Sequence, residues 1–453
     1  MGRYFLFAFS FVLLAALTES TVFENSNVIK TVDLSSHIVK VTLRITVHFT
    51  ENDQSDYLLA IPAEEYEHLA YIDATVAKKV DTRVHFLKMD EEHHVALYGV
   101  DSSNLKDKSV ILVHYYLTHV LMSLPASVKQ DETPKYVFTS LMLIQSPYIT
   151  STQEIRVKLP QSTYESATQD PTMHMSDGVI TYGPFPSTSP FSSSTPLRIH
   201  FPSNAQFRTF DKVEREIEVS QWGNVAIEEV VHARNSATPL TGEFSRLDYF
   251  RSDPDASSAW DSLSGHVDKR AKDLYYRDII GNVTTSSVRR EKEAVAVELF
   301  TRFPMMGGWK IEFYWGYNLP SGRVLKKEGR RFLLKVPYST PLTKADVREL
   351  SVRVVLPECV KNVKFELPEG VEEPSLDYRY TYLDSSMEGR PVYEFTMKNL
   401  IDLQNTDTIT VSYELNPLVL WREPLMCISA FFILFLVKAI VKKVMYVNKE
   451  KTD

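Results

Sequence analysis

Cysteine is scarce in this chain of 453 residues, which contains only Cys359 and Cys427. Cys427 lies inside a long apolar run near the C-terminus and Cys359 lies well before it, which excludes a disulfide framework within the chain. Large exported domains often depend on disulfides. This chain must depend on its hydrophobic cores, which favours residence inside the secretory pathway over display at the cell surface.

An excess of positive charge is also missing. Lysine and arginine total 50 against 58 aspartate and glutamate residues, which gives a formal net charge of −8. Surfaces that bind nucleic acid or anionic membranes are usually basic. We therefore predict no nucleic-acid partner.

Catalytic signatures are absent too: there is no His-Glu-x-x-His helix, Gly-x-Ser-x-Gly elbow, Walker loop or dinucleotide fingerprint. Asp253 and Asp255 have the Asp-x-Asp spacing with which glycosyltransferases hold a metal-bound nucleotide sugar, although a surface loop explains them as well. His93 and His94 could bind a metal, but adjacent side chains on a strand point apart, which favours a solvated hairpin tip. We predict no catalytic activity, metal or cofactor.

The N-terminal residues 1–20 form one of two long apolar runs. Arg3 precedes YFLFAFSFVLLAAL, and small or polar residues follow. This layout is typical of a secretory signal peptide. Cleavage after Thr18 or Ser20 would start the mature chain near Thr21.

The second run, PLMCISAFFILFLVKAIV, predicts a transmembrane helix with its flanks at 418–445. Seventeen residues from Leu425 to Val441 rise ~1.5 Å each, which is marginal but adequate for a bilayer core. Lys438 lies near the end of the run, where its long side chain can reach the headgroups. A buried helix of a soluble protein is the alternative.

Positive charge follows this run and predicts its orientation, because such charge belongs on the cytosolic side. The lysines are Lys438, Lys442, Lys443, Lys449 and Lys451. Together with the signal peptide they predict a single-pass type I protein with a cytosolic tail at 446–453. Lys449 and Lys451 are spaced like a dilysine signal for retrieval to the endoplasmic reticulum, with plain topogenic charge as the alternative.

Between the two runs, strand-like alternation of apolar and polar residues dominates. It occurs in segments that include 37–50, 109–120, 154–160, 216–231 and 408–415. Two helices are predicted, at 271–280 and 343–350. The fold class that we predict is mainly β.

The strand-like segments recur in the same order. The matched positions are Ser35 with Ser220, Tyr116 with Trp315, and Pro160 with Pro357. Nearly constant spacing predicts two tandem sandwich-like domains, at 21–208 and 209–417, before the single C-terminal helix. The Ser/Pro-rich stretch 183–196 is then a loop before the closing strand LRIHF of the first domain, unless it is itself the linker.

The aromatic run RFPMMGGWKIEFYWGYNLPSG, residues 302–322, is a candidate binding platform or a strand. At a period of two, one face collects Trp309, Ile311, Phe313, Trp315 and Tyr317. The apparent repeat favours a core strand of the second domain. Gly307 and Gly308 would permit its tight entry, and NLPSG its exit.

The motif NVT at 282–284 is the only Asn-x-Ser/Thr sequon in which x is not proline. In a lumenal domain Asn282 would accept a glycan, which predicts an exposed loop.

Longer motifs carry a family resemblance. They are EVSQWGNVAIEE (218–229), DLYYRDIIGNVTTS (273–286), RFPMMGGWK with GYNLP (302–320), YTYLD (380–384), GRPV (389–392) and REPL (422–425). In this order they resemble the ribophorin I family, whose members are the large lumenal subunit of the eukaryotic oligosaccharyltransferase. The resemblance covers the second domain and the membrane helix; over the first domain it rests on layout and on LAIP (59–62).

The resemblance implies a non-catalytic subunit of the complex that transfers a dolichol-linked oligosaccharide to sequon asparagines in the endoplasmic reticulum. The implied partners are a catalytic multi-span subunit, small membrane subunits and, as a possibility, nascent polypeptides. Vertebrate family members continue into a cytosolic domain linked to ribosome contact, whereas this chain stops at Asp453, so ribosome contact is not inferred. The alternative is a type I lumenal cargo-binding receptor or chaperone.

Overall fold

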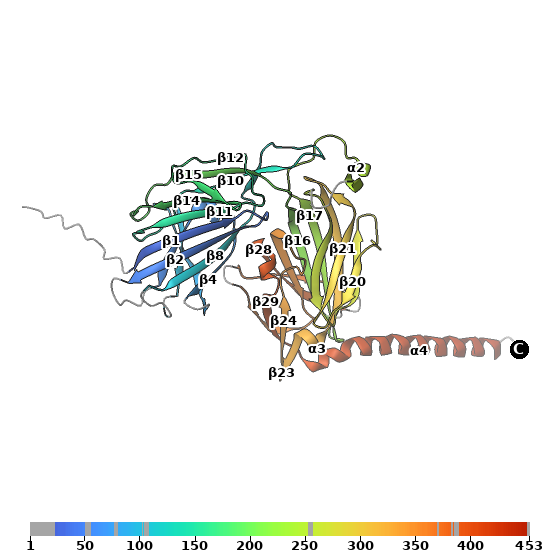
Figure 1. Ribbon diagram of the computed structural model, residues 1–453. Coiled ribbons are helices and arrows are strands. Elements are labelled where there is room, and N and C mark those ends of the chain that lie inside the picture. The colour runs from blue at the N-terminus through green and yellow to red at the C-terminus, as the bar shows by residue number, and fades with distance from the viewer. Residues whose placement is uncertain are drawn as a thin grey trace, which may run out of the picture.

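The computed structural model describes residues 23–450 apart from 50–55, 77–79, 102, 104–107, 252–256, 369–370, 382–383 and 385–388. These described residues fold mainly into β-sheets, and one long helix follows them (Figure 1). The predicted fold class, mainly β with a single apolar C-terminal helix, is confirmed. The predicted signal peptide lies outside the described residues.

The first half of the chain builds an eight-stranded sheet in the order β13-β14-β11-β1-β2-β8-β4-β5. In chain order its strands are β1 (Phe23–Asp33), β2 (Val39–Phe49), β4 (Leu69–Val76), β5 (Val80–Thr82), β8 (Val110–Leu117), β11 (Gln153–Lys158), β13 (His174–Ser176) and β14 (Val179–Phe185). All neighbours in it are antiparallel except β1 and β11, which are parallel.

Two smaller sheets complete this half. One has the order β12-β15-β10-β9 and consists of β9 (Leu121–Ser123), β10 (Lys135–Leu141), β12 (Ser166–Ala167) and β15 (Pro196–Pro202). The other has the order β3-β7-β6 and consists of β3 (Tyr57–Pro62), β6 (Val84–Asp90) and β7 (Val95–Val100), with helix α1 (Ala63–Tyr66) after β3. Apolar residues from all three sheets share one hydrophobic core.

The second half builds a seven-stranded sheet in the order β19-β22-β17-β16-β25-β28-β27. Its strands are β16 (Arg208–Val219), β17 (Asn224–Asn235), β19 (Lys272–Asp278), β22 (Lys310–Pro320), β25 (Asp346–Val355), β27 (Ser375–Arg379) and β28 (Arg390–Leu400). Two further sheets pack with it: β18 (Trp260–Asp268), β20 (Ser287–Arg290) and β21 (Ala294–Met305); and β23 (Leu325–Glu328), β24 (Arg331–Pro337), β26 (Lys361–Glu366) and β29 (Thr408–Glu414). The short helices are α2 (Arg246–Arg251), α3 (Ser321–Val324) and η2 (Asp402–Gln404).

The two large sheets repeat one topology. In each, three consecutive antiparallel strands, β1-β2-β8 or β16-β17-β22, are joined by a strand that runs parallel to the first, β11 or β25. Strands β14 and β13 in the first sheet correspond to β28 and β27 in the second. A single parallel pair at the same place in both orders confirms the predicted repeat of strands.

One residue match within that repeat is wrong. When the first strands are aligned on Ser35 and Ser220, the strand registers place Val113, and not Tyr116, at the position of Trp315. Tyr116 lies on the outer face of β8, whereas Val113 and Trp315 are buried. The connections before β8 and β22 differ in length. A constant spacing along the sequence therefore matches Trp315 with a residue of β8 that is an odd number of positions away from Val113, and such a residue points to the opposite face of the sheet.

Both predicted helices are also wrong. The segment 271–280 contains strand β19, which pairs with β22, and 343–350 contains the start of β25, which pairs with β16 and β28. Strand β25 is central, so it gains backbone hydrogen bonds on two sides and buries apolar residues on both faces. Strand β19 is an edge strand, which pairs with β22 on one side and packs Tyr276 into the core. These tertiary contacts outweigh local helix propensity.

Each half of the chain has its own large hydrophobic core. One core is built from residues between Phe23 and Phe207 with Ala237, and the other from residues between Phe210 and Leu415. Strand β15 pairs with β10 inside the first half, so 183–196 precedes a closing strand, as the sequence predicts. This arrangement supports our proposal that the domain boundary lies at residues 208 and 209.

The C-terminal segment consists of the 3-10 turn η3 (Pro417–Trp421) and helix α4 (Arg422–Glu450). Residues Arg422–Lys443 are long and apolar enough to cross a membrane, and the folded domains do not bury them. Figure 1 shows α4 leaving the folded body beside α3 and β23.

Candidate functional site

The aromatic run that the sequence singles out contains the end of β21, the turn after it and strand β22. Phe313, Trp315 and Tyr317 are buried, and Trp309 and Ile311 are half-buried against the same core. The prediction of a core strand is confirmed, because the aromatic face points into the protein and not toward a ligand.

The glycine pair before β22 makes a close approach to a neighbouring loop. A Cβ atom on Gly307 would lie 2.0 Å from the carbonyl oxygen of Thr238. Gly308 has a φ of +82°, which side chains disfavour. The predicted tight entry into the strand therefore depends on both glycines.

Beneath this strand lies a buried ion pair that we did not predict. Arg215 on β16 pairs with Glu229 on β17, and both are about 1% exposed. Glu229 also accepts hydrogen bonds from Trp315 Nε1 and Thr340 Oγ1, each at 2.8 Å. Burial lowers the pKa of Arg215, but the negative charge of Glu229 and the Tyr317 hydroxyl outweigh it, so the pKa lies above its ordinary value. Arg215 therefore keeps its positive charge although it is buried.

The first domain contains a similar buried pair. Lys30 Nζ on β1 lies 2.9 Å from Glu65 Oε1, to which Ser140 also donates at 2.6 Å. Tyr115 donates to the other oxygen at 2.7 Å. Burial raises the pKa of Glu65, but these contacts outweigh it and leave the pKa below its ordinary value. Glu65 and Ser140 also line a cavity of about 400 Å³ that His119 borders.

The two cations occupy equivalent places in the repeated topology. The alignment of Ser35 with Ser220 superimposes Lys30 on Arg215. Both residues replace an apolar side chain at an inward position of an alternating strand, within VIKTV and VEREI. A charged residue that interrupts the apolar face of a strand was the sequence signal that could have predicted these buried ion pairs.

A third buried carboxylate lies where the two domains meet. Asp346 at the start of β25 is 1% exposed, and its oxygens lie 3.1 Å from His37 Nε2 and 3.1 Å from His119 Nε2, both in the first domain. Thr209 Oγ1 donates to it at 2.9 Å. Burial raises the pKa of Asp346, but the contacts with His119 and His37 outweigh it and hold the pKa well below its ordinary value. These contacts join the domains.

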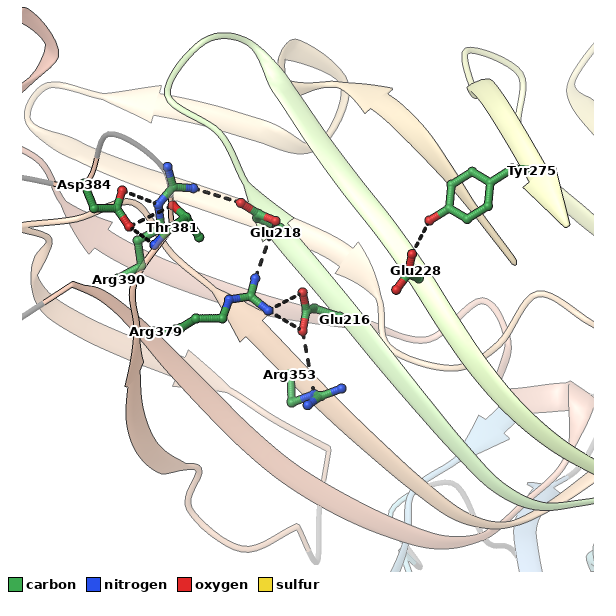
Figure 2. A network of polar contacts seen from close by, with 9 residues as sticks. All are labelled: Glu216, Glu218, Glu228, Tyr275, Arg353, Arg379, Thr381, Asp384 and Arg390. Carbon is green, nitrogen blue, oxygen red and sulfur yellow. Dashed lines mark hydrogen bonds and ion pairs between the residues drawn. The ribbon is translucent and has the colours of Figure 1, made fainter. Parts of the chain in front are cut away.

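The outer face of the seven-stranded sheet carries a ladder of opposite charges, which Figure 2 shows. Arg379 Nη1 contacts both carboxylate oxygens of Glu216, at 2.8 and 3.0 Å. Arg390 bridges Glu218 at 2.8 Å and Asp384 at 3.0 Å. The ladder ties β16 to β28 and to the edge strand β27, and its acids are matched by arginines.

The weak catalytic candidates do not gather into a site. His93 lies in the turn between β6 and β7, where its Nδ1 is 2.9 Å from Asp90 Oδ2, as expected for a hairpin tip. Asp253 and Asp255 lie outside the described residues. Within the part of the chain that the structure describes, no group of three or more His, Cys, Asp or Glu side chains could hold a metal ion.

The sequon lies on an exposed loop between β19 and β20. Asn282 is exposed, and the neighbouring Ile279 and Ile280 are 82% and 79% exposed. Arg302 holds the loop: it pairs with Asp278, and its Nη2 donates to the Asn282 carbonyl oxygen at 3.2 Å. The Asn282 side chain is therefore accessible to a glycosylating enzyme. Of the two tail lysines, Lys449 lies in the last turn of α4 and Lys451 lies outside the described residues.

Comparison with known families agrees with these features. The family model described as Ribophorin I matches residues 23–442. The chain belongs to the ribophorin I family. The match covers both large sheets and most of α4, so both β-rich domains and the apolar helix belong to the family's region of similarity.

Several curated relatives of this ribophorin I family chain are named dolichyl-diphosphooligosaccharide–protein glycosyltransferase subunit 1, 1A or 1B. The Caenorhabditis elegans protein is 34% identical over 95% of this chain and 74% of its own length. Subunit 1A of Arabidopsis thaliana is 32% identical over 91% of this chain and 68% of its own length, and subunit 1B is 30% identical over 96% of each. Among solved structures, native yeast LTA4 hydrolase covers 40% of this chain with 29% of its own, at a TM-score of 0.27 and 8% identity.

Proposed function

We propose that this protein is a non-catalytic accessory subunit of the oligosaccharyltransferase complex. It would support transfer of the dolichol-linked oligosaccharide to the asparagine of Asn-x-Ser/Thr sequons on nascent proteins. The observation that carries the proposal is the match to the Ribophorin I family across 23–442, together with relatives named as subunits of that transferase.

The arrangement of buried carboxylates supports a non-catalytic role. Glu65, Glu229 and Asp346 each contact a cationic or imidazole side chain and at least one hydroxyl donor. Such carboxylates stabilise the fold and are poor candidates for a general base, because their charge is already compensated. The chemistry would then reside in a catalytic multi-span subunit, with small membrane subunits as further partners and nascent polypeptides in contact with the lumenal domains.

The proposed location is the endoplasmic reticulum membrane. Helix α4 would cross it once, with the lysines after Val437 on the cytosolic side and both β-rich domains in the lumen. Lys449 and Lys451 would contribute a retrieval signal.

The test is purification of the full chain in mild detergent, combined with depletion in cells. We expect co-isolation with the multi-span transferase and reduced occupancy of sequons on a glycoprotein reporter, restored by the wild-type chain. A chain that purifies alone, and whose depletion leaves reporter glycosylation intact, would favour a cargo receptor or chaperone and reject the subunit.

A rescue variant separates the accessory role from catalysis. The double variant Asp253→Asn, Asp255→Asn keeps the size of both side chains but removes the charges that a metal-bound nucleotide sugar would need. It should restore reporter glycosylation as fully as the wild type. Failure to do so, at equal expression and co-isolation, would overturn the non-catalytic assignment.

A further inference from the structure

The tip of the β16–β17 hairpin, residues 220–223, presents a tryptophan to the outside. Trp222 is 63% exposed. The tip sequence Ser-Gln-Trp-Gly contains no charged side chain, and Gly223 has a φ of +94°, which suits a tight turn. A single exposed tryptophan needs no explanation by itself, so its surroundings decide what it does.

The hairpin tip is joined to the first turn of α4. Trp222 Nε1 donates a hydrogen bond to Glu423 Oε2 at 2.5 Å. On the other side of the tip, the Ser321 amide at the start of α3 donates to the Gly223 carbonyl oxygen at 2.9 Å. The tip, α3 and the beginning of the apolar helix therefore meet at one end of the second domain.

The start of α4 is held to the same domain by a second contact. Arg422 Nη1 lies 2.9 Å from Cys359 Sγ and 3.9 Å from Glu358 Oε1 in the loop after β25, and Glu358 is 1% exposed. Two contacts from neighbouring residues, to two different loops, fix the level of the hairpin tip relative to the helix.

That level coincides with the beginning of the apolar run. Leu425 follows Glu423 by two positions, which is about 3 Å along a helix. Trp421 and Leu418, in the turn before α4, are 65% and 72% exposed. If α4 crosses a bilayer, both tryptophans lie at the boundary between the headgroups and the hydrocarbon.

We propose that the hairpin tip rests in the headgroup region of the bilayer that α4 crosses, where Trp222 and Trp421 form an aromatic anchor for the second domain. The inference rests on the membrane crossing proposed above. Tryptophan suits this region because its ring is apolar and its N–H group needs a polar partner. Here Glu423 is that partner. The anchor uses indole rings and not basic residues, so it requires no anionic lipid.

The experiment uses the full chain reconstituted into phosphatidylcholine nanodiscs, with tryptophan fluorescence quenched by lipids brominated near the headgroup. The Trp222→Phe variant should lose part of the lipid-quenchable emission, and Trp421→Phe should lose another part. Trp309→Phe is the matched control, because Trp309 lies just before β22, at the end of that strand that is far from the tip. The other end of β22, at Pro320, pairs with Asn224 beside the tip. It should leave lipid quenching unchanged. Replacing some of the lipid with phosphatidylserine should not strengthen the Trp222 contribution.

Two results would overturn the anchor. In one, Trp222→Phe leaves lipid quenching unchanged and removes emission that aqueous iodide quenches, so the tip faces water. In the other, Trp222 is protected from both quenchers in the purified complex, so a partner subunit covers it. Quenching of Trp421 reports independently whether α4 is inserted in the membrane. If Trp421 is still quenched in either case, the membrane crossing stands and only the placement of the hairpin tip is rejected. Co-isolation with the transferase decides the proposed function separately. An unchanged unfolding temperature of Trp222→Phe excludes a folding defect.

Discussion

Trp315 on β22 donates a hydrogen bond from its indole nitrogen to the buried Glu229 carboxylate at 2.8 Å. The ring itself is 1% exposed and lies in the core of the second domain. One side chain therefore packs the core and also satisfies an acceptor of the Arg215–Glu229 ion pair. The aromatic run has a structural role through this contact.

A Trp315→Ala variant should lower the free energy of unfolding by ~3 kcal/mol or more, because a large buried ring is lost and an acceptor loses its donor. Trp315→Phe should cost less, since it keeps most of the ring. Denaturant unfolding of the intact protein measures both, and recovery of the assembled complex should fall with stability. Trp309→Ala is the control, because Trp309 is only half-buried. Equal losses for the two alanine variants would contradict this role of Trp315.

The alternation of apolar residues was sufficient to predict the aromatic core face and many of the strands, although it missed β19 and the start of β25. It also revealed the repeat, because β1, β2 and β8 have counterparts with the same pattern. It could not predict Glu65 as the partner of Lys30, because Glu65 comes from a short helix outside the repeated strands. Nor could it bring Asp346 to His37 and His119, which depends on how the domains pack.

The helix predictions failed for a related reason. Lysine, alanine, glutamate and leucine near 343–350 favour a helix locally. In the folded chain the same segment starts β25, between β16 and β28, and hydrogen bonds on both sides decide its conformation. Local propensity carries no information on such distant partners.

Glu229 and Glu216 lie on adjacent strands but on opposite faces of the sheet, and they should differ sharply in what they contribute to stability. Glu229→Gln removes one partner of a fully buried ion pair and leaves Arg215 uncompensated, so we expect a loss of ~3–5 kcal/mol. Glu216→Gln removes a partly exposed contact of the outer ladder with Arg379, and we expect a loss of under about 1 kcal/mol. Thermal and denaturant unfolding of both variants tests the contrast. A loss for Glu216→Gln as large as that for Glu229→Gln would show that the ladder is a main source of stability.

The contact of Asp346 with the first domain should depend on pH. Its pKa lies below the ordinary value of about 3.9. The ionised form therefore contributes stability that is complete above about pH 4 and is lost as the pH falls through the lower pKa of the folded state. The unfolding temperature of Asp346→Asn should lie below that of the wild type at neutral pH, and the gap should shrink below about pH 4. A gap that is unchanged at pH 3 would contradict the assignment.

The tail lysines should affect where the protein resides and not how it folds. Replacing Lys449 and Lys451 by serine removes the proposed retrieval signal, while Lys442 and Lys443 keep the positive charge that sets orientation. We expect some of the protein to acquire glycan modifications made beyond the endoplasmic reticulum. Replacing Lys442 and Lys443 instead is the matched control. Unchanged localisation of the tail variant would indicate that assembly alone retains the protein.

Asn282 should carry an N-linked glycan, and that glycan would also report the orientation of the chain. Its side chain is exposed on a loop that Arg302 holds in place, so an enzyme in the lumen could reach it. Glycosidase treatment should increase the gel mobility of the wild type and leave Asn282→Gln unchanged. Thr284→Ala should abolish the shift without altering the asparagine, and Thr284→Ser should keep it, because the sequon accepts either hydroxyl. A shift in the wild type that disappears in both sequon variants would place the second domain in the lumen. A wild type without a shift would contradict the prediction.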